Sequence, residues 1–108
     1  MNRVLKRETA KRDLIEQFVW YAESVSIGVA DRFLASAQNT LERLAAAPDS
    51  GALVEVTRKE LAGMRRWPVK GFEKILLFYI PFSNGIDLVR VLHGSRDLHR
   101  LFEDPQGV

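Results

Sequence analysis

Several side chains in the second half of the chain are of the types that bind or cleave a phosphate ester. They are Arg65 or Arg66, Lys70, Lys74, Arg90, His93 and Arg96. They belong to adjacent predicted strands and the turn that follows them. Cations that converge on a concave sheet stabilise a phosphorane-like transition state, and a histidine can move the proton. An RNA-cleaving site of this kind would use Arg65, Lys74, Arg90 and His93.

The alternative for these cations is structural. Arg65, Lys74 and Arg90 would then rim the sheet and form ion pairs, with partners drawn from Glu73, Asp87 and Asp97. Residues 58–100 carry nine basic and four acidic side chains, a surplus of +5, although the net charge of the chain is +2. This surplus favours an anionic partner, either nucleic acid or an acidic protein. A solvated basic surface is the other explanation.

Other familiar chemistry is absent from the sequence. The chain has no cysteine, which excludes a disulfide framework, a thiolate metal site and a cysteine nucleophile. His93 and His99 have no carboxylate at ligand spacing, so we predict no metal and no cofactor. Gly63 and Gly71 flank a strand and do not open a helix, so they form no phosphate loop.

The bulk composition is that of one ordinary globular domain, residues 1–108, with 46% hydrophobic and 28% charged residues. No apolar run approaches the roughly 18 residues that span a bilayer. The first residues turn charged too early for a signal peptide. We therefore expect a cytoplasmic domain that does not enter a membrane.

Two strands, residues 72–82 and 86–93, form the predicted centre of the fold. The turn Ser83-Asn84-Gly85 separates them, with glycine at the position that needs a left-handed backbone. This turn pairs Phe82 with Ile86, Ile80 with Leu88, Phe78 with Arg90 and Leu76 with Leu92. Both faces of the hairpin are then largely apolar, so both must be covered.

Two helices can cover one of these faces. A helical period runs from about residue 8 to residue 25, with an apolar stripe formed by Leu14, Ile15, Phe18, Ala22 and Val25. Trp20 lies nearly opposite the stripe, as a partner anchor or as a lid over another segment. Ser26 is the predicted N-cap of a second helix that ends before Pro48. The short connection makes the pair an antiparallel hairpin.

The remaining segments complete an α+β prediction. Residues 3–6 form a short strand, residues 63–67 form another that Pro68 ends, and residues 98–102 form a short helical tail. Residues 52–61 show no clear period. The helices then lie on one side of an antiparallel sheet, and the cover of its other face remains to be explained.

Four segments match a known pattern. Residues 30–34 read Ala-Asp-Arg-Phe-Leu, residues 44–48 read Leu-Ala-Ala-Ala-Pro, residues 63–72 read Gly-Met-Arg-Arg-Trp-Pro-Val-Lys-Gly-Phe, and residues 90–98 read Arg-Val-Leu-His-Gly-Ser-Arg-Asp-Leu. Together they resemble the ParE branch of the ParE/RelE superfamily, the toxins of bacterial type II toxin–antitoxin modules. The resemblance covers nearly the whole chain. It implies an N-terminal strand and a two-helix hairpin packed on a small twisted antiparallel sheet.

The resemblance also implies a partner, a ParD-like antitoxin with a ribbon-helix-helix N-terminus. Its C-terminal segment would wrap along the toxin and provide the missing cover of the sheet. The candidate contacts are the apolar side chains expected to be exposed, together with one sheet cation: Trp20, Trp67, Phe78, Leu88 and Arg90.

For the target, the resemblance leaves alternatives. ParE-like members poison DNA gyrase, whereas RelE-like members cleave messenger RNA on the ribosome. The RelE-type proton-transfer group near the chain end has only His93, His99 and Phe102 as stand-ins here. The resemblance therefore favours a gyrase inhibitor that binds no DNA by itself, with Arg66, Lys70, Arg90, His93 and Arg96 as candidate target contacts. An inactive remnant that only binds its antitoxin is the third possibility.

Overall fold

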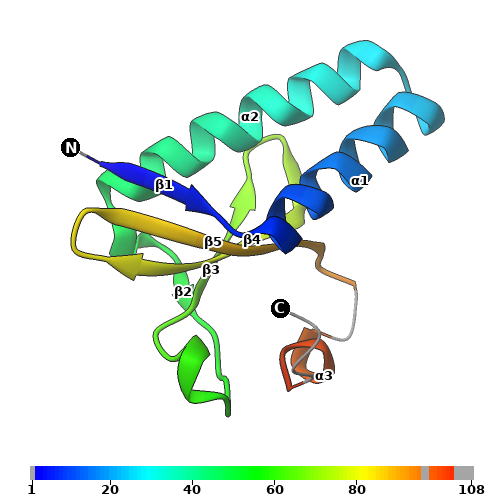
Figure 1. Cartoon of the computed structure of the whole chain (residues 1–108). Helices are drawn as coiled ribbons and strands as arrows, with labels where there is room; N and C mark the ends of the chain where they lie inside the picture. Colours follow the sequence, from blue (N-terminus) through cyan, green and yellow to red (C-terminus); the bar gives the residue numbers. More distant parts are fainter. Residues whose placement is uncertain (1, 96–97, 104–108) are drawn as a thin grey trace.

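In the computed structural model, which describes residues 2–95 and 98–103, a helix hairpin lies over one face of a five-stranded sheet (Figure 1). The elements in chain order are β1 (Arg3–Lys6), α1 (Glu8–Ser24), α2 (Ile27–Ala46), η1 (Pro48–Ser50), β2 (Ala52–Leu53), η2 (Lys59–Leu61), β3 (Arg65–Val69), β4 (Phe72–Phe82), β5 (Gly85–His93) and α3 (Leu98–Glu103). The strands lie in the order β1-β5-β4-β3-β2. The predicted α+β fold is confirmed, and the parallel pairing of β1 with β5 makes the sheet mixed.

The helix boundaries follow the capping signals in the sequence. The Ser26 hydroxyl accepts a hydrogen bond from the Val29 N–H at 3.1 Å, as expected of an N-cap. The helix α2 ends at Ala46, two residues before Pro48. The predicted buried stripe of α1 is wrong in part, because Ile15 and Val25 are exposed. The helix instead packs on the core through Ala10, Leu14 and Tyr21, a face rotated by roughly a quarter turn.

The hairpin of β4 and β5 differs from its predicted register near the turn. Phe82 pairs with Gly85 and Ile80 with Asp87, so the connection is one residue shorter than expected. A bulge between Phe78 and Tyr79 adds one residue on β5 and restores the predicted pairing of Phe78 with Arg90. Because one residue of slip reverses the side-chain alternation, this bulge turns Leu88 toward the helices.

Gly85 is required where β1 approaches the turn. Its φ is +152°, and a Cβ atom there would lie 1.9 Å from the Arg3 carbonyl oxygen. The Arg3 N–H donates to the Asn84 carbonyl at 2.6 Å, which fixes the start of β1 beside β5.

The chain itself covers the face of the sheet that lies opposite the helix hairpin of α1 and α2. Leu61, Met64 and Phe102, from the segment around η2 and from α3, are buried there on the sheet. The Phe102 and Phe78 rings lie 4.8 Å apart between centroids. Figure 1 shows both covering segments on the side away from α1 and α2. The expectation that this face is open for a second polypeptide is therefore wrong for the described residues.

Candidate functional site

Arg90 forms a buried ion pair with α1. Its Nε lies 2.6 Å from Oδ2 of Asp13 and its Nη2 lies 3.0 Å from Oδ1. The two side chains are only 12% and 7% exposed. Asp13 also accepts the Val91 N–H at 2.9 Å. Arg90 therefore has a structural role in a buried ion pair, whereas we expected it on an exposed surface of the sheet.

The position of Asp13 follows from the short β1 strand. The ladder between β1 and β5 ends at Lys6 and Leu88, so no strand of the described residues lies beside the rest of that edge of β5. Side chains of α1 take over this role: the Thr9 hydroxyl donates to the Val89 carbonyl, and Asp13 accepts from Val91. Backbone groups that would otherwise be buried without partners are satisfied in this way. Asp13 was not predicted as a functional or structural partner, because nothing in the local sequence distinguishes it from an exposed helix carboxylate.

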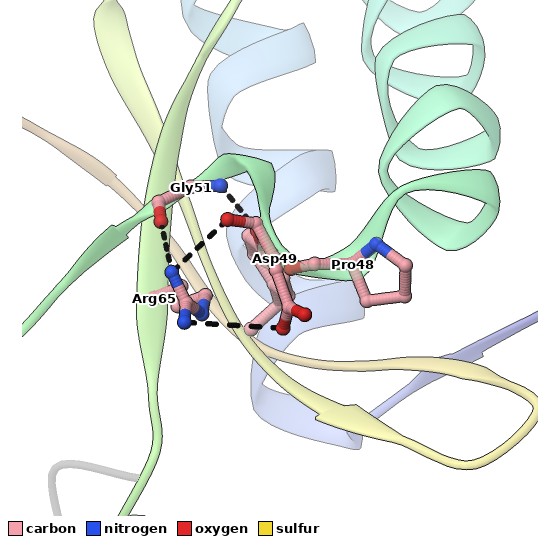
Figure 2. Close-up of polar contacts among 5 residues, drawn as sticks. Pro48, Asp49, Gly51 and Arg65 are labelled. Carbon is pink, nitrogen blue, oxygen red and sulfur yellow. Dashed lines mark hydrogen bonds and ion pairs between the residues drawn. The ribbon is translucent and has the colours of Figure 1, made fainter.

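Arg65 is also held by structural contacts, which Figure 2 shows. Its guanidinium donates to the carbonyl oxygens of Gly51 at 2.7 Å and Asp49 at 3.1 Å. Tyr79 holds the same loop through two hydrogen bonds. Its hydroxyl donates to the Pro48 carbonyl at 2.8 Å and accepts from the Gly51 N–H at 2.9 Å. Burial raises the pKa of Tyr79 above its ordinary value, so this phenol stays protonated at neutral pH.

The ion pairs proposed as the structural alternative also differ from those observed. Arg65 lies near the carboxylate of Asp49, Arg90 pairs with Asp13, and Asp87 pairs with Arg7 at 3.2 Å. Asp97 lies outside the described residues. The partners come from η1, from α1 and from the residue before α1, which are distant in sequence from β3 and β5, the strands that carry Arg65, Asp87 and Arg90.

Lys74 and His93 line the same pocket, which has a volume of about 560 Å³ and lies between the end of α1 and the sheet. Its lining is Gln17, Trp20, Tyr21, Val25, Lys74, Ile75, His93 and Ser95, and we name it the Trp20–His93 pocket. The Ser95 N–H donates to Nδ1 of His93 at 3.2 Å, and the Ser95 hydroxyl oxygen lies 2.7 Å from the same nitrogen. Burial raises the pKa of the Tyr21 phenol above its ordinary value.

A second surface runs along α2 and the hairpin of β3 and β4. Three adjoining cavities of about 960, 310 and 540 Å³ form it, and neighbouring cavities share lining residues. Its four cations are Arg32, Arg43, Arg66 and Lys70. We name this surface the cationic groove. In the described part of the chain, none of these four side chains has a hydrogen-bond or ion-pair partner.

Two hydroxyl groups of α2 fix the far wall of this groove. The Ser36 hydroxyl donates to the Lys70 carbonyl, and Thr40 Oγ1 accepts the Lys70 N–H at 3.4 Å. Gly71, at φ +83°, forms the turn that follows, and its N–H donates to the Glu73 carboxylate. The tip of the β3–β4 hairpin is therefore anchored beside the middle of α2.

The candidate site residues predicted from the sequence lie in different places in the structure. Arg66, Lys70 and Trp67 line the cationic groove, whereas Trp20, Lys74 and His93 line the other pocket. Arg96 and the side chain of His99 lie outside the part that the structure describes.

Phe78 and Leu88 were expected to expose an apolar face for the antitoxin. This expectation is wrong, because both are buried inside the chain, Phe78 under α3 and Leu88 under the helices.

Arg32 and Arg43 were missed by the sequence analysis. They lie eleven residues apart on α2, which is three helical turns, so they share one face. That spacing was a signal in the sequence. Its meaning depended on the β3–β4 hairpin, which places Lys70 on the same side.

The sequence matches the family described as the ParE toxin of the type II toxin–antitoxin system parDE over residues 4–98. The chain belongs to the ParE toxin family. Among curated proteins, no sequence matches it significantly. A solved structure described as the chromosomal ParDE TA system from P. aeruginosa has a similar fold, with a TM-score of 0.70 at 16% identity. The match covers 86% of this chain and 96% of that chain.

Membership of the ParE family makes this chain the toxin component of a type II toxin–antitoxin system, which has an antitoxin as its partner. No helix in the described part is long and apolar enough to cross a membrane. No three His, Asp or Glu side chains of the described residues gather as metal ligands.

Proposed function

We propose that this ParE-family chain stops bacterial growth by binding and poisoning DNA gyrase in the cytoplasm, and that a ParD-like antitoxin neutralises it. The support is the family match together with the dispersal of the expected RNA-cleaving residues. Arg65 holds the loop after α2, and Arg90 pairs with a buried carboxylate. The other two of the four expected RNA-cleaving residues, Lys74 and His93, line one pocket.

The separation of Arg65 and Arg90 from Lys74 and His93 is the main support for a toxin that acts by binding. Ribonuclease chemistry requires several cations and a proton-transfer group around one phosphate. A cation that donates to backbone carbonyls, or that lies in a buried ion pair, is not available to a transition state. A toxin that acts by binding needs only an exposed surface, and both the Trp20–His93 pocket and the cationic groove provide one.

The test is a supercoiling assay with purified gyrase and relaxed plasmid. The chain alone should block supercoiling and accumulate broken DNA, and adding its antitoxin should restore the reaction. Full supercoiling at excess toxin, from a preparation that arrests growth when expressed, would contradict the gyrase target.

A second candidate function, ribosome-dependent cleavage of messenger RNA, rests on one observation. Lys74, His93 and the Trp20 indole line the same pocket, which could hold a nucleotide. This candidate predicts cleaved transcripts in cells that express the chain, and loss of cleavage in His93→Ala. A chain that has no effect on growth would instead be an inactive remnant that only binds its antitoxin.

A further inference from the structure

We propose that the cationic groove is the docking surface for an acidic, amphipathic, extended segment of a partner polypeptide, the antitoxin. This inference rests on the proposed function, since it names the surface and the chemistry by which the toxin receives its neutraliser. It also relocates that contact. The sheet face that we expected the antitoxin to cover is already covered by residues around η2 and by α3.

The spacing of the cations suits an extended chain. Arg32 and Arg43 are eleven residues apart on α2, roughly 16 Å along the helix axis. The backbone of Lys70 forms hydrogen bonds with Ser36 and Thr40. These two residues lie between Arg32 and Arg43 on α2, so Lys70 lies between the two arginines along the groove. An extended peptide advances about 3.3 Å per residue, so it passes all three cations in about five residues. Carboxylates on one side of such a segment, at every second residue, would meet them.

The apolar part of the groove lining is suited to the other side of that segment. Small or apolar side chains line it, namely Val29, Ala35, Ala46, Leu44 and Pro68. The Trp67 side chain, 39% exposed, lies further along the groove beside Arg66. A tryptophan exposed beside cations is a common anchor for an apolar side chain of a partner. The groove therefore offers both apolar and charged contacts.

The same lining favours a polypeptide over a nucleic acid. Glu42 and Glu73 also line the groove. A single-stranded nucleic acid carries a charge on every residue and would bring phosphates close to these carboxylates, whereas a peptide can place neutral residues there. Single-strand binding also relies on aromatic side chains that stack with successive bases. Of the three cavities that form the groove, the largest has one aromatic residue in its lining, the half-buried Phe72, and the other two share Trp67, so the described lining of the groove has two aromatic residues and no continuous series of them.

The experiment is a titration of the full-length toxin with the full-length antitoxin encoded beside it. The groove variant is R32E/R43E/K70E. The matched control is R3E/R12E/K59E, which makes the same change in net charge at exposed cations outside the groove. Affinity is measured by calorimetry at about 100 and about 400 mM salt, because exposed charge pairs are screened. Thermal melts report whether each variant folds.

We expect the groove variant to bind the antitoxin at least about 100-fold more weakly, and to lose most of the salt dependence of binding. The control should stay within about threefold of the wild type. Trp67→Ala should cost about tenfold, and the single variants Arg43→Gln and Lys70→Gln provide the same test if the triple variant does not fold.

Wild-type affinity in the groove variant would overturn this inference. So would an equal loss in the control, because net charge and not the groove would then govern binding. So would a groove variant that still binds the antitoxin but fails to inhibit gyrase or to retain single-stranded RNA, because the groove would then belong to the target. The proposed function fails separately, if the wild-type toxin leaves supercoiling intact or binds no antitoxin.

Discussion

Two regions of this toxin carry cations that look alike in sequence and differ in the fold. Arg90 and Arg65 lie in the body of the sheet, and the chain provides their acceptors, Asp13 for one and the loop after α2 for the other. Arg43 and Lys70 border the cationic groove and have no partner among the described residues. The first region stabilises the toxin, and the second is available to another molecule.

The difference shows why counting basic residues is a weak guide to a binding surface. A buried cation requires a nearby anion or several acceptors, because burial without them costs several kcal/mol. An exposed cation needs nothing from its own chain. Mutations in the two regions should therefore change different quantities, the free energy of unfolding in one and the affinity for a partner in the other.

The largest effect is expected for Asp13→Ala. It removes the carboxylate that pairs with the buried Arg90 and accepts the Val91 N–H. We expect a loss of about 3–5 kcal/mol in the free energy of unfolding, measured by urea denaturation.

The matched control for this variant is Asp31→Ala, at an exposed position on α2, which should cost less than about 0.5 kcal/mol. Asp13→Leu combined with Arg90→Leu should recover part of the loss, because no unpaired charge then stays buried. Equal stability of Asp13→Ala and the wild type would remove the distinction between the two regions.

A smaller effect is expected for Arg65→Met. It removes hydrogen bonds to the carbonyl oxygens of Gly51 and Asp49, while the apolar stem of the side chain is kept. Stability should fall by about 1–3 kcal/mol in denaturant titrations. If the variant were as stable as the wild type but failed to act on the target, Arg65 would belong with the functional cations.

Tyr79→Phe tests the other fastening of the same loop, and its effect depends on pH. At pH 8 it should cost about 1–2 kcal/mol, for the two lost hydrogen bonds to Pro48 and Gly51. Burial raises the pKa of the folded phenol above that of the unfolded chain, about 10. The contribution is complete below that value and falls as the pH rises through the folded pKa, because the unfolded phenol ionises first.

The measurement is the free energy of unfolding of both proteins at pH 8 and above pH 10. The difference between wild type and variant should shrink at the higher pH. A constant difference would mean that Tyr79 ionises equally in both states.

The smallest effect on stability is expected for Lys70→Gln in the cationic groove. The backbone of this residue is held by Ser36 and Thr40, and its exposed ammonium group has no partner among the described side chains. The free energy of unfolding should stay within about 0.5 kcal/mol of the wild-type value, so the melting temperature should change little. A large loss would place Lys70 with the structural cations and would break the comparison.

Sequence alone determined the elements that depend on local signals. Ser26 and Pro48 bounded α2 because an N-cap and a proline act on the backbone beside them. The β4–β5 hairpin was predicted from its two apolar runs and the glycine between them, and the ParE resemblance from four short segments.

Only the tertiary structure decided which residues met across the chain. The bulge in β5 moved Leu88 under the helices, and Asp13 took the place of a strand beside Val91. Residues around η2 and α3 covered the sheet face that had been left for a partner. Each outcome depends on contacts between segments distant in sequence, whose geometry local preferences do not encode. For the same reason, Arg65 and Arg90 became structural while Arg43 and Lys70 stayed available.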